Sequence, residues 1–255
     1  MSGSLVYNLQ NLSYHYSSNK AALNQINLKI SAGERIMLLG PNGCGKSTLQ
    51  KILAGLIFAT DGTFTAFDRK INENTMKDKN FSAAFRRKVG FVFQNSDVQL
   101  FCSSVLDEIM FGPIAMGLDL SQSKKRAQDL LAYCDIASLS QDSPHHLSGG
   151  EKKKVAIAAV LASNPDVLIF DEPTNGLDPK SQRWILNTIN DLNRQGKTII
   201  LATHQLSFVP EIADRVIVLS DDHEIVAEGS PQNILSNRDL LVATNLVDPQ
   251  DQTFE

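Results

Sequence analysis

A glycine-rich segment near the start of the chain constrains the fold more than any other feature. Residues 40–47 have the sequence GPNGCGKS, which matches G-x-x-x-x-G-K-[ST]. An apolar run at 35–39 precedes the segment and a helical pattern at 46–55 follows it. Glycines let backbone N–H groups wrap a phosphate without a Cβ in the way. The segment therefore predicts a nucleotide site at a strand-to-helix turn.

The residue types in this loop indicate how the nucleotide is held. We expect Lys46 to contact the β and γ phosphates and the Ser47 hydroxyl to bind Mg²⁺. The residues that we expect around the phosphates are Gly40, Asn42, Gly43, Cys44, Gly45, Lys46, Ser47 and Thr48.

The chain has three widely spaced cysteines, Cys44, Cys102 and Cys134. They form neither a disulfide framework nor a zinc pattern, so a reducing compartment is expected. Cys44 has two interpretations. A thiol near a helix N-terminus can be redox-active through a lowered pKa. We favour the alternative, in which Cys44 occupies a variable position of the loop.

Composition excludes several classes of function. The formal net charge of -4 argues against a nucleic-acid partner, which would need a large basic surface. No apolar run approaches the roughly 18 residues that a membrane-spanning helix needs. Residues 1–10 lack a basic stretch followed by an apolar core, so no signal peptide is expected.

Hydrophobic patterning predicts an α/β fold. Alternating strands are expected at 5–9, 26–30 and 62–67, and buried strands at 35–39 and 89–93. Helices and strands alternate after residue 149. A first helix runs to 163, and further helices are expected at 179–195 and 207–213. The strands between and after them are expected at 167–170, 198–202 and 215–219. This alternation predicts a parallel sheet with helices on both faces.

A mostly helical insert is expected between about 95 and 151. Its clearest helix is predicted at 123–137, with turns at Gly112, Pro113 and Gly117. Residues 237–255 give no clear pattern.

A second anion site is predicted at Ser148, Gly149 and Gly150, which precede an apolar-patterned helix. A Ser-Gly-Gly turn presents backbone N–H groups and a hydroxyl at the positive end of the helix dipole. One phosphate loop already accounts for a nucleotide. Two anion-binding turns in one small domain therefore suggest two half-sites, each completed by another copy of the domain.

Two carboxylates follow the apolar run 167–170. Ligands of parallel sheets lie beyond the carboxyl ends of the strands, where Asp171 and Glu172 are expected. We expect Asp171 to bind Mg²⁺, mostly through water, and Glu172 to orient and deprotonate the attacking water.

Taken in order, these motifs resemble the nucleotide-binding domain of ATP-binding cassette (ABC) proteins. The order is the phosphate loop, Phe93-Gln94, Leu147-Ser-Gly-Gly150, Phe170 to Asp178, and Thr203-His204. The resemblance covers about residues 4–230. It implies a phosphate-loop NTPase of α/β class with an N-terminal antiparallel β subdomain. The expected ABC domain spans 4–236, with a catalytic core at about 4–94 and 152–230, an insert at 95–151 and a short tail at 237–255.

The resemblance also implies a head-to-tail dimer with two ATP molecules and Mg²⁺ at its interface. Ser148, Gly149 and Gly150 would grip the γ phosphate bound to the other copy. Gln94 would sense the γ phosphate and Mg²⁺, and His204 would hold the transition state.

Two further positions follow from the same resemblance. Asp178 would belong to the loop that communicates across the dimer. An aromatic ring would stack on adenine, and Tyr16 fits the expected spacing better than Tyr14.

The segment after Gln94 indicates a branch of the family. QNSDVQLF at 94–101 is similar to the Q-N-P-x-x-Q-L-F segment of energy-coupling factor (ECF) importers and cobalt or nickel uptake ATPases, with Ser96 in place of proline. Either the apolar residues of this region pack the insert, or they receive helices of a membrane subunit. Those residues are Leu100, Phe101, Val105, Ile109 and Phe111.

One departure from the family lies after the Ser-Gly-Gly turn. Glu151 stands where many relatives have glutamine, and Lys152, Lys153 and Lys154 follow it. We expect the lysines to form a solvated helix face, with a partner-facing patch as the alternative.

The sequence thus predicts a peripheral ATPase subunit at the cytoplasmic face of the cell membrane. It would energise an ECF-type importer of a micronutrient, either a transition metal ion such as cobalt or nickel or a vitamin. A second ATPase subunit is expected, as a homodimer or a heterodimer with the homodimer favoured. A multi-spanning membrane subunit would dock near Gln94–Phe111.

Three alternatives remain open. The chain could serve another class of ABC transporter, or act as a soluble cassette on DNA or ribosomes, which the acidic balance and the single phosphate loop disfavour. Metal binding by His145 and His146 is disfavoured because adjacent side chains diverge and no further ligands cluster nearby.

Overall fold

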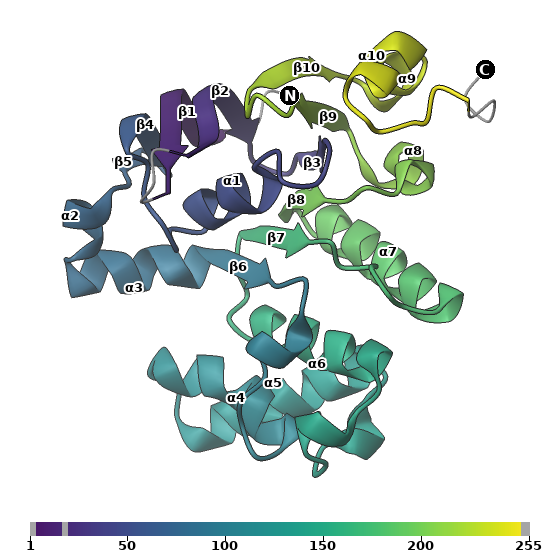
Figure 1. Cartoon of the computed structure of the whole chain (residues 1–255). Helices are drawn as coiled ribbons and strands as arrows, with labels where there is room; N and C mark the ends of the chain where they lie inside the picture. The colour runs from purple at the N-terminus through teal and green to yellow at the C-terminus, as the bar shows by residue number, and fades with distance from the viewer. Residues whose placement is uncertain (1–3, 17–19, 251–255) are drawn as a thin grey trace. The chain divides into compact units, whose positions relative to one another are not determined.

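The computed structural model describes residues 4–16 and 20–250 and divides into two compact units. The first unit comprises the chain up to Ser82 and from Ile189 onward, and the second comprises Ala83–Thr188. The divisions fall inside helices α3 (Lys79–Lys88) and α7 (Pro179–Arg194) (Figure 1).

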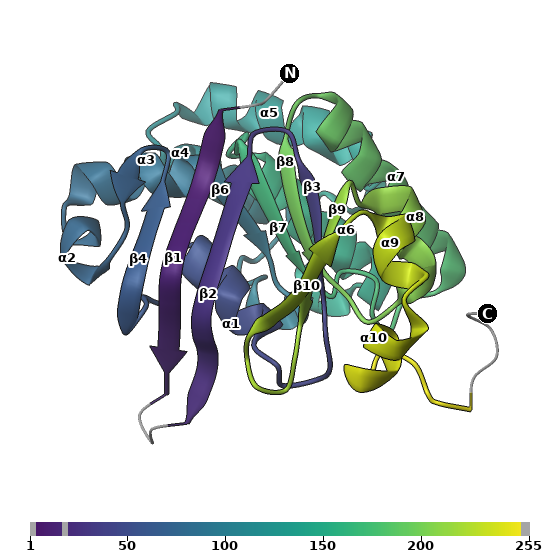
Figure 2. The same cartoon turned by 90° about the horizontal axis from the view of Figure 1, so that it is seen from above.

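The first unit begins with the predicted antiparallel sheet, in the strand order β2-β1-β4-β5. The strands are β1 (Leu5–His15), β2 (Ala21–Ser31), β4 (Asp61–Ala66) and β5 (Arg69–Lys70). Figure 2 shows β4, β1 and β2 lying side by side. Alternate residues of β2 are buried, as the period of two in the sequence predicts.

In the same unit, the strand that leads into the phosphate loop lies between two parallel strands. β3 (Arg35–Leu39) pairs in parallel with β8 (Thr198–Ala202) on one side and β9 (Arg215–Leu219) on the other. All three bounds agree with the predicted strands, because a strand covered on both faces gives an unbroken apolar run. β10 (Ile225–Gly229), which we did not predict, adds an antiparallel edge to β9.

Helices of the first unit follow these strands. α1 (Lys46–Leu53) begins directly after the phosphate loop. The predicted helix at 207–213 is only a 3₁₀ turn at Leu206–Phe208 and the short α8 (Val209–Ile212). The region without a predicted pattern contains α10 (Arg238–Ala243), which follows α9 (Pro231–Leu235).

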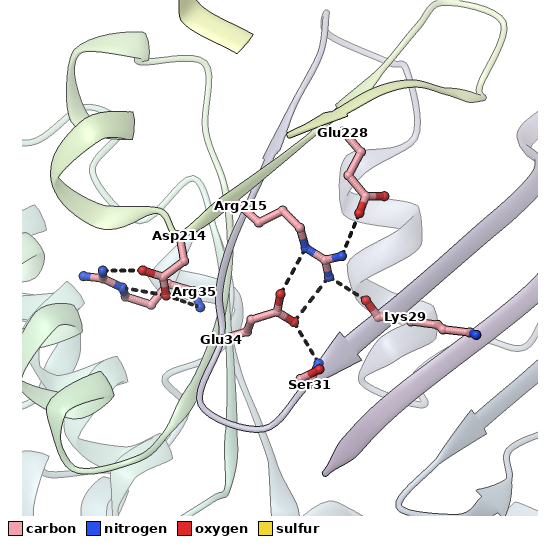
Figure 3. Close-up of polar contacts among 7 residues, drawn as sticks. All are labelled: Lys29, Ser31, Glu34, Arg35, Asp214, Arg215 and Glu228. Atoms are coloured by element: carbon pink, nitrogen blue, oxygen red, sulfur yellow. Dashed lines mark hydrogen bonds and ion pairs between the residues drawn. The ribbon is translucent and has the colours of Figure 1, made fainter. Parts of the chain in front are cut away.

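A charged cluster joins the starts of β3 and β9 to the ends of β2 and β10 (Figure 3). The Arg215 guanidinium contacts Glu34 at 3.1 Å and Glu228 at 2.7 Å, and it donates to the Lys29 carbonyl. Arg35 forms a bidentate pair with Asp214, with its Nε donating at 3.1 Å. These pairs connect β2, β3, β9 and β10, so the two sheets of this unit share one polar seam.

In the second unit, β6 (Val89–Val92) pairs in parallel with β7 (Val167–Asp171). Between them the chain forms the predicted helical region, with α4 (Val105–Ala115), α5 (Leu120–Tyr133) and α6 (Gly149–Leu161) (Figure 1). Val105, Ile109, Leu131 and Val155 are among the buried residues of its core.

The predicted turn at Gly112 and Pro113 is wrong, because both residues lie inside α4. A Cβ at Gly112 would lie 3.0 Å from Ser163 Oγ, so this glycine allows close approach of the chain that follows α6. Gly117, with φ of 90°, lies two residues after the helix and supplies the turn.

The remaining short elements complete the chain. The helix α2 (Glu73–Met76) was not predicted, and neither was α3. Single 3₁₀ turns occur at Ser96–Val98, Ala137–Leu139 and Pro144–His146. Among the described residues, no helix has both the length and the apolar character needed to cross a bilayer.

Candidate functional site

The phosphate loop joins β3 to α1, as predicted. Gly40, Gly43 and Gly45 have φ of 145°, 87° and 110°, which side-chain-bearing residues rarely adopt. A Cβ at Gly45 would also collide with the Ala22 carbonyl, and one at Gly40 with the Leu219 carbonyl. Conformation therefore favours glycine at all three positions, and space requires it at Gly40 and Gly45.

Lys46 lies inside this loop and is only 7% exposed. Its ammonium donates hydrogen bonds to the carbonyls of Gly40 at 2.6 Å and Pro41 at 2.9 Å. Ser47 and Thr48 follow at the first turn of α1, whose N-terminus carries the positive end of the helix dipole. A lysine ammonium, a hydroxyl and a helix N-terminus together form a strongly anion-attracting site.

Tyr16 lies beside the loop and Tyr14 supports it. The Tyr16 hydroxyl is 3.2 Å from Thr48 Oγ1, and the residue is 46% exposed. Tyr14 meets Tyr16 edge to face, with the ring centroids 5.0 Å apart. This geometry agrees with the choice of Tyr16, although its stacking on adenine stays a prediction.

Cys44 is buried at 1% exposure. Burial raises the pKa of the Cys44 thiol, and the nearby Lys46 charge only partly opposes this effect. A raised thiol pKa disfavours the redox interpretation, because the thiolate is the reactive form.

His223 is a contact of the loop that the sequence did not reveal. It lies in the turn between β9 and β10, and its Nδ1 is 3.2 Å from the Cys44 carbonyl. Its backbone φ of 65° is unusual for a residue with a side chain. No local motif marks this position, because the contact joins residues 179 apart in sequence.

His204 emerges at the same edge as the phosphate loop. It follows β8, whose last residue Ala202 is opposite Leu38 of β3. Thr203 N donates to the Leu38 carbonyl at 3.4 Å, which continues the pairing up to the residue before His204. The imidazole is exposed, and its role in hydrolysis stays a prediction.

In the second unit, Gln94 and the two carboxylates also share one edge. β6 and β7 run parallel with Val92 opposite Phe170, so Asp171 at the end of β7 and Gln94 just after β6 lie at the carboxyl ends of the strands. Asp171 and Glu172 are 7% and 8% exposed. Glu172 has φ of 43°, and such strained positions concentrate at functional sites.

The predicted second anion site is the N-terminus of α6. Ser148 is the N-cap, and its hydroxyl donates to the Glu151 carboxylate at 2.7 Å. The Glu151 carboxylate also accepts from Ser148 N at 2.9 Å. Hydrogen bonds from Ser148 hold the pKa of the Glu151 carboxyl below its usual range. The turn is therefore a capping box, which fixes the start of the helix.

Asp178 lies close to the same turn. A Cβ at Gly150 would be 2.6 Å from Ser181 Oγ and 3.8 Å from Asp178 Oδ2. Asp178 caps the start of α7 by accepting from Ser181 N at 3.0 Å and from the Ser181 hydroxyl. The structure thus brings together two loops that the sequence treats as separate motifs.

The expectation of a solvated lysine face is wrong for Lys153. This residue is 3% exposed, and its ammonium donates to two main-chain carbonyls. Lys152 forms an ion pair with Asp97 at 2.7 Å, and Lys154 lies 5.1 Å from the Trp184 ring centroid.

The apolar residues after Gln94 separate into two groups. Leu100, Val105 and Ile109 are buried and pack the core of the second unit. Phe101 and Phe111 are 63% and 52% exposed and meet edge to face at 4.9 Å. Packing of the insert is therefore confirmed for the first three residues, and docking of a membrane subunit on the two phenylalanines stays a prediction.

Glu108 fixes the main chain at Phe101. This carboxylate is 4% exposed and accepts from Phe101 N at 2.9 Å and Cys102 N at 2.7 Å. Phe111 is one turn further along α4 than Glu108, so the same helix carries the Phe111 ring and the acceptor for Phe101 N.

The hypothesis of a histidine metal site gains no support. Within 4–16 and 20–250, no group of three or more histidine, cysteine or acidic residues could hold a metal ion.

The fold and the phosphate loop define an ATPase of the ABC class, and comparison with known proteins agrees. Residues 23–175 match the family model described as ABC transporter. The chain belongs to this family, as an ATP-binding protein whose ATPase activity is coupled to transport. Within the family it falls in the energy-coupling factor branch.

Two curated relatives illustrate this position. A putative ABC transporter ATP-binding protein of Methanosarcina acetivorans is 48% identical over 245 residues, covering 95% of this chain and 89% of the relative. The energy-coupling factor transporter ATP-binding protein EcfA of Methanosphaera stadtmanae is 41% identical, covering 93% of this chain and 84% of the relative.

Solved structures show the same fold. The cbiO1 protein of Clostridium perfringens, described as part of the ABC transporter complex cbiONQ, is similar with a TM-score of 0.81 and 34% identity, covering 96% of each chain. The cassette MJ0796, in a dimer bound to ADP and Pi, gives a TM-score of 0.79 and 30% identity, covering 88% of this chain and 98% of that one.

Proposed function

We propose that this chain is the peripheral ATPase subunit of an ECF-type importer that carries a micronutrient into the cell. The observation that supports the proposal best is the exposed pair of Phe101 and Phe111. Phe111 lies on α4, and the buried Glu108 of the same helix accepts a hydrogen bond from Phe101 N. Singly exposed apolar residues are common, but a paired and positioned aromatic surface is typical of an interaction site. The partner that docks on this chain near Gln94–Phe111 is a multi-spanning membrane subunit.

The phosphate loop fits the phosphates of ATP. Its glycine backbone has no room for side chains at Gly40 and Gly45, and Lys46 supplies a positive charge. Tyr16 stacks on the adenine, and the loop from Gly40 to Thr48 holds the phosphates.

The proposed Mg²⁺ ligands are all oxygen atoms, and Mg²⁺ prefers oxygen ligands. The donors are the Ser47 hydroxyl, the Gln94 side-chain amide and the Asp171 carboxylate. When bound, the ion neutralises charge that develops on the phosphates.

Glu172 accepts the proton of the attacking water, since a carboxylate is the group suited to this task at the end of β7. Gln94 senses the γ phosphate and Mg²⁺ and links them to the helical insert, and His204 stabilises the charge on the γ phosphate. A dimer completes each site, with Ser148, Gly149 and Gly150 of one copy at the γ phosphate of the other. Asp178 lies beside that turn and connects the two sites.

The chain acts as a homodimer, at the cytoplasmic face of the membrane. Its cargo is a transition metal ion such as cobalt or nickel, or a vitamin, and the cargo crosses through the membrane subunits. The similarity to EcfA and to cbiO1, which is part of the ABC transporter complex cbiONQ, supports the ECF class.

Purification from detergent-solubilised membranes tests this proposal. The chain should co-purify with a multi-spanning subunit, and the isolated complex should hydrolyse ATP and take up a radiolabelled micronutrient in vesicles. Recovery of a complex with an exporter, or of a chain bound to ribosomes, would contradict the ECF proposal and favour one of its alternatives.

A further inference from the structure

Lys153 is a buried charge that the proposed reaction does not use. It is 3% exposed, whereas lysine is almost never fully buried unless its ammonium is paired. Burial lowers the pKa of the Lys153 ammonium to about 8, and the charge of Asp171 acts in the opposite direction. Keeping such a group in the interior is costly, so its contacts are informative.

The Lys153 ammonium contacts the turn that carries Gln94. It donates hydrogen bonds of 2.8 Å to the main-chain carbonyls of Phe93 and Gln94. Charged donors form roughly twice as strong hydrogen bonds as neutral ones, which makes this a firm attachment.

A second side chain attaches the same turn to the same helix. Gln99 Nε2 donates to the Ala156 carbonyl at 3.0 Å, and Gln99 Oε1 accepts from Phe93 N at 3.2 Å. Lys153 reaches from α6 to the turn and Gln99 reaches from beyond the turn back to α6. The backbone around Gln94 is therefore held on α6 from both directions.

The other end of this attachment is the Ser148 turn. Ser148 caps α6 and lies five residues before Lys153, about 7.5 Å along a helix that rises about 1.5 Å per residue. The first turns of α6 therefore connect Ser148 to Lys153, and the hydrogen bonds of Lys153 connect the helix to the turn at Gln94.

We propose that Lys153 is a positioning residue for ATP hydrolysis, which fixes the Gln94 turn to α6 so that Gln94 and Ser148 move together. The inference rests on the proposed roles of Gln94 and Ser148. A γ phosphate that draws in Gln94 then also shifts the serine turn offered to the other copy. The simpler hypothesis is that Lys153 only stabilises the core, and the experiment below distinguishes the two hypotheses.

Lys153→Met tests this inference in the full-length protein. Methionine keeps an unbranched apolar stem but removes the ammonium, so the two carbonyls lose their donor. We expect ATP binding to stay within about twofold of the parent, because the Lys153 ammonium bonds the carbonyls of Phe93 and Gln94 and is not among the residues proposed to hold the phosphates. We expect kcat to fall by about tenfold to a hundredfold, since small misplacements of a catalytic group have effects of this size. The Mg²⁺ concentration for half-maximal rate should rise as well.

Matched controls lie on either side of Lys153. Lys152→Met removes the ion pair with Asp97, and Lys154→Met removes the contact with Trp184. Both should leave kcat within about twofold of the parent, because exposed or partly exposed contacts are worth little. Lys153→Arg should restore most of kcat, since guanidinium can donate to both carbonyls.

The inference is overturned if Lys153→Met keeps the parent kcat and Mg²⁺ dependence while folded. It is also overturned if the variant loses ATP binding, kcat and melting temperature together and Lys153→Arg does not restore kcat, because that result describes a purely structural lysine. If the proposed function itself is wrong, the result differs: the parent protein shows no ATPase activity that depends on Glu172.

Discussion

Ser148 and Glu151 cap the same helix terminus reciprocally, with the Ser148 hydroxyl donating to Glu151 at 2.7 Å and Glu151 N donating to Ser148 Oγ at 3.4 Å. The residue proposed to contact the γ phosphate in the partner's site is thus held by an ionised carboxylate. This arrangement has a consequence that depends on pH.

The stabilising effect of Glu151 should disappear in acid. Hydrogen bonds from Ser148 lower the pKa of Glu151 in the folded state from the ordinary value of 4.5. A lowered folded-state pKa stabilises the protein above the unfolded pKa, and the effect is lost as pH falls through the folded pKa. Glu151→Ala should therefore melt at a lower temperature than the parent at pH 7, with the difference shrinking below about pH 4.5.

Glu151→Gln is the matched control for this titration. Glutamine can complete a capping box without a charge, so most of the stability at pH 7 should remain and no acid-dependent change should appear. Thermal unfolding of the three proteins between pH 7 and pH 4 measures the effect. A constant difference between parent and Glu151→Ala at every pH would contradict the expected titration.

Glu172→Gln should reduce ATP turnover by about 10²-fold to 10⁴-fold, because removal of a general base has effects of this size. ATP binding should persist, since the phosphate loop is unchanged. Steady-state hydrolysis and binding of a fluorescent ATP analogue measure the two properties. Glu228→Gln makes the same chemical change at a surface ion pair and should leave turnover unaltered. Parent-level turnover in Glu172→Gln would mean that another group is the base.

A mixed dimer tests whether each ATP site is shared between copies. One copy carries Ser148→Arg and the other carries Lys46→Ala. If sites are shared, one site of the mixed dimer is intact and the other has both changes, so about half of the parent activity should remain if the sites act independently. Each variant alone should be inactive. A mixed dimer without activity would indicate that Ser148 and Lys46 serve the same site within one chain.

The exposed aromatic pair should be dispensable for folding but needed for docking. Phe101→Ser with Phe111→Ser removes an edge-to-face contact worth about 0.5–1.5 kcal/mol, so the melting temperature should fall only slightly. Co-purification with the membrane subunit should be lost, while ATP hydrolysis by the isolated chain is retained.

Ile109→Ala is the contrasting change on the same helix. Ile109 is fully buried, so this substitution should cost about 2–5 kcal/mol of unfolding free energy. Chemical denaturation of both variants measures the difference. Retention of the membrane subunit by the double phenylalanine variant would exclude this surface as the docking site.

Two glycines of the phosphate loop differ in a way that can be measured. A Cβ at Gly45 would collide with the Ala22 carbonyl, whereas a Cβ at Gly43 meets no atom within 4 Å. Both glycines have positive φ, so both alanine variants are strained. Gly45→Ala should lose far more ATP affinity than Gly43→Ala, as titration with a fluorescent nucleotide would show. Equal losses would mean that strain, not space, dominates in this loop.

Much of the fold could be predicted because its signals are local. The parallel strands around the phosphate loop have unbroken apolar runs with sharp ends, as at Ile199 and Val216. β10 was missed because its residues alternate between partly exposed and exposed positions and offer no apolar face. Gly112 and Pro113 resemble a turn in sequence, yet both lie inside α4, where the missing Cβ of Gly112 leaves room for Ser163 after α6.

The candidate site was predictable where a motif carries it, as at Lys46. It was not predictable where distant chain segments meet. Lys153 looks like part of a solvated lysine run, because the carbonyls that receive its hydrogen bonds belong to residues about 60 positions earlier. Likewise, Glu108 has no local feature that marks it as the acceptor for the Phe101 turn.

The turn from Ser220 to Glu224 illustrates how far from the phosphate loop its determinants extend. It is a short surface hairpin, and protein engineers would choose such a turn for an epitope tag or a circular permutation. Yet His223 contacts the Cys44 carbonyl, and Asn24 bonds both the His223 carbonyl and Glu224. An insertion there would remove the contact between His223 and the nucleotide-binding loop. A label placed at this turn would therefore change the very activity it was meant to report.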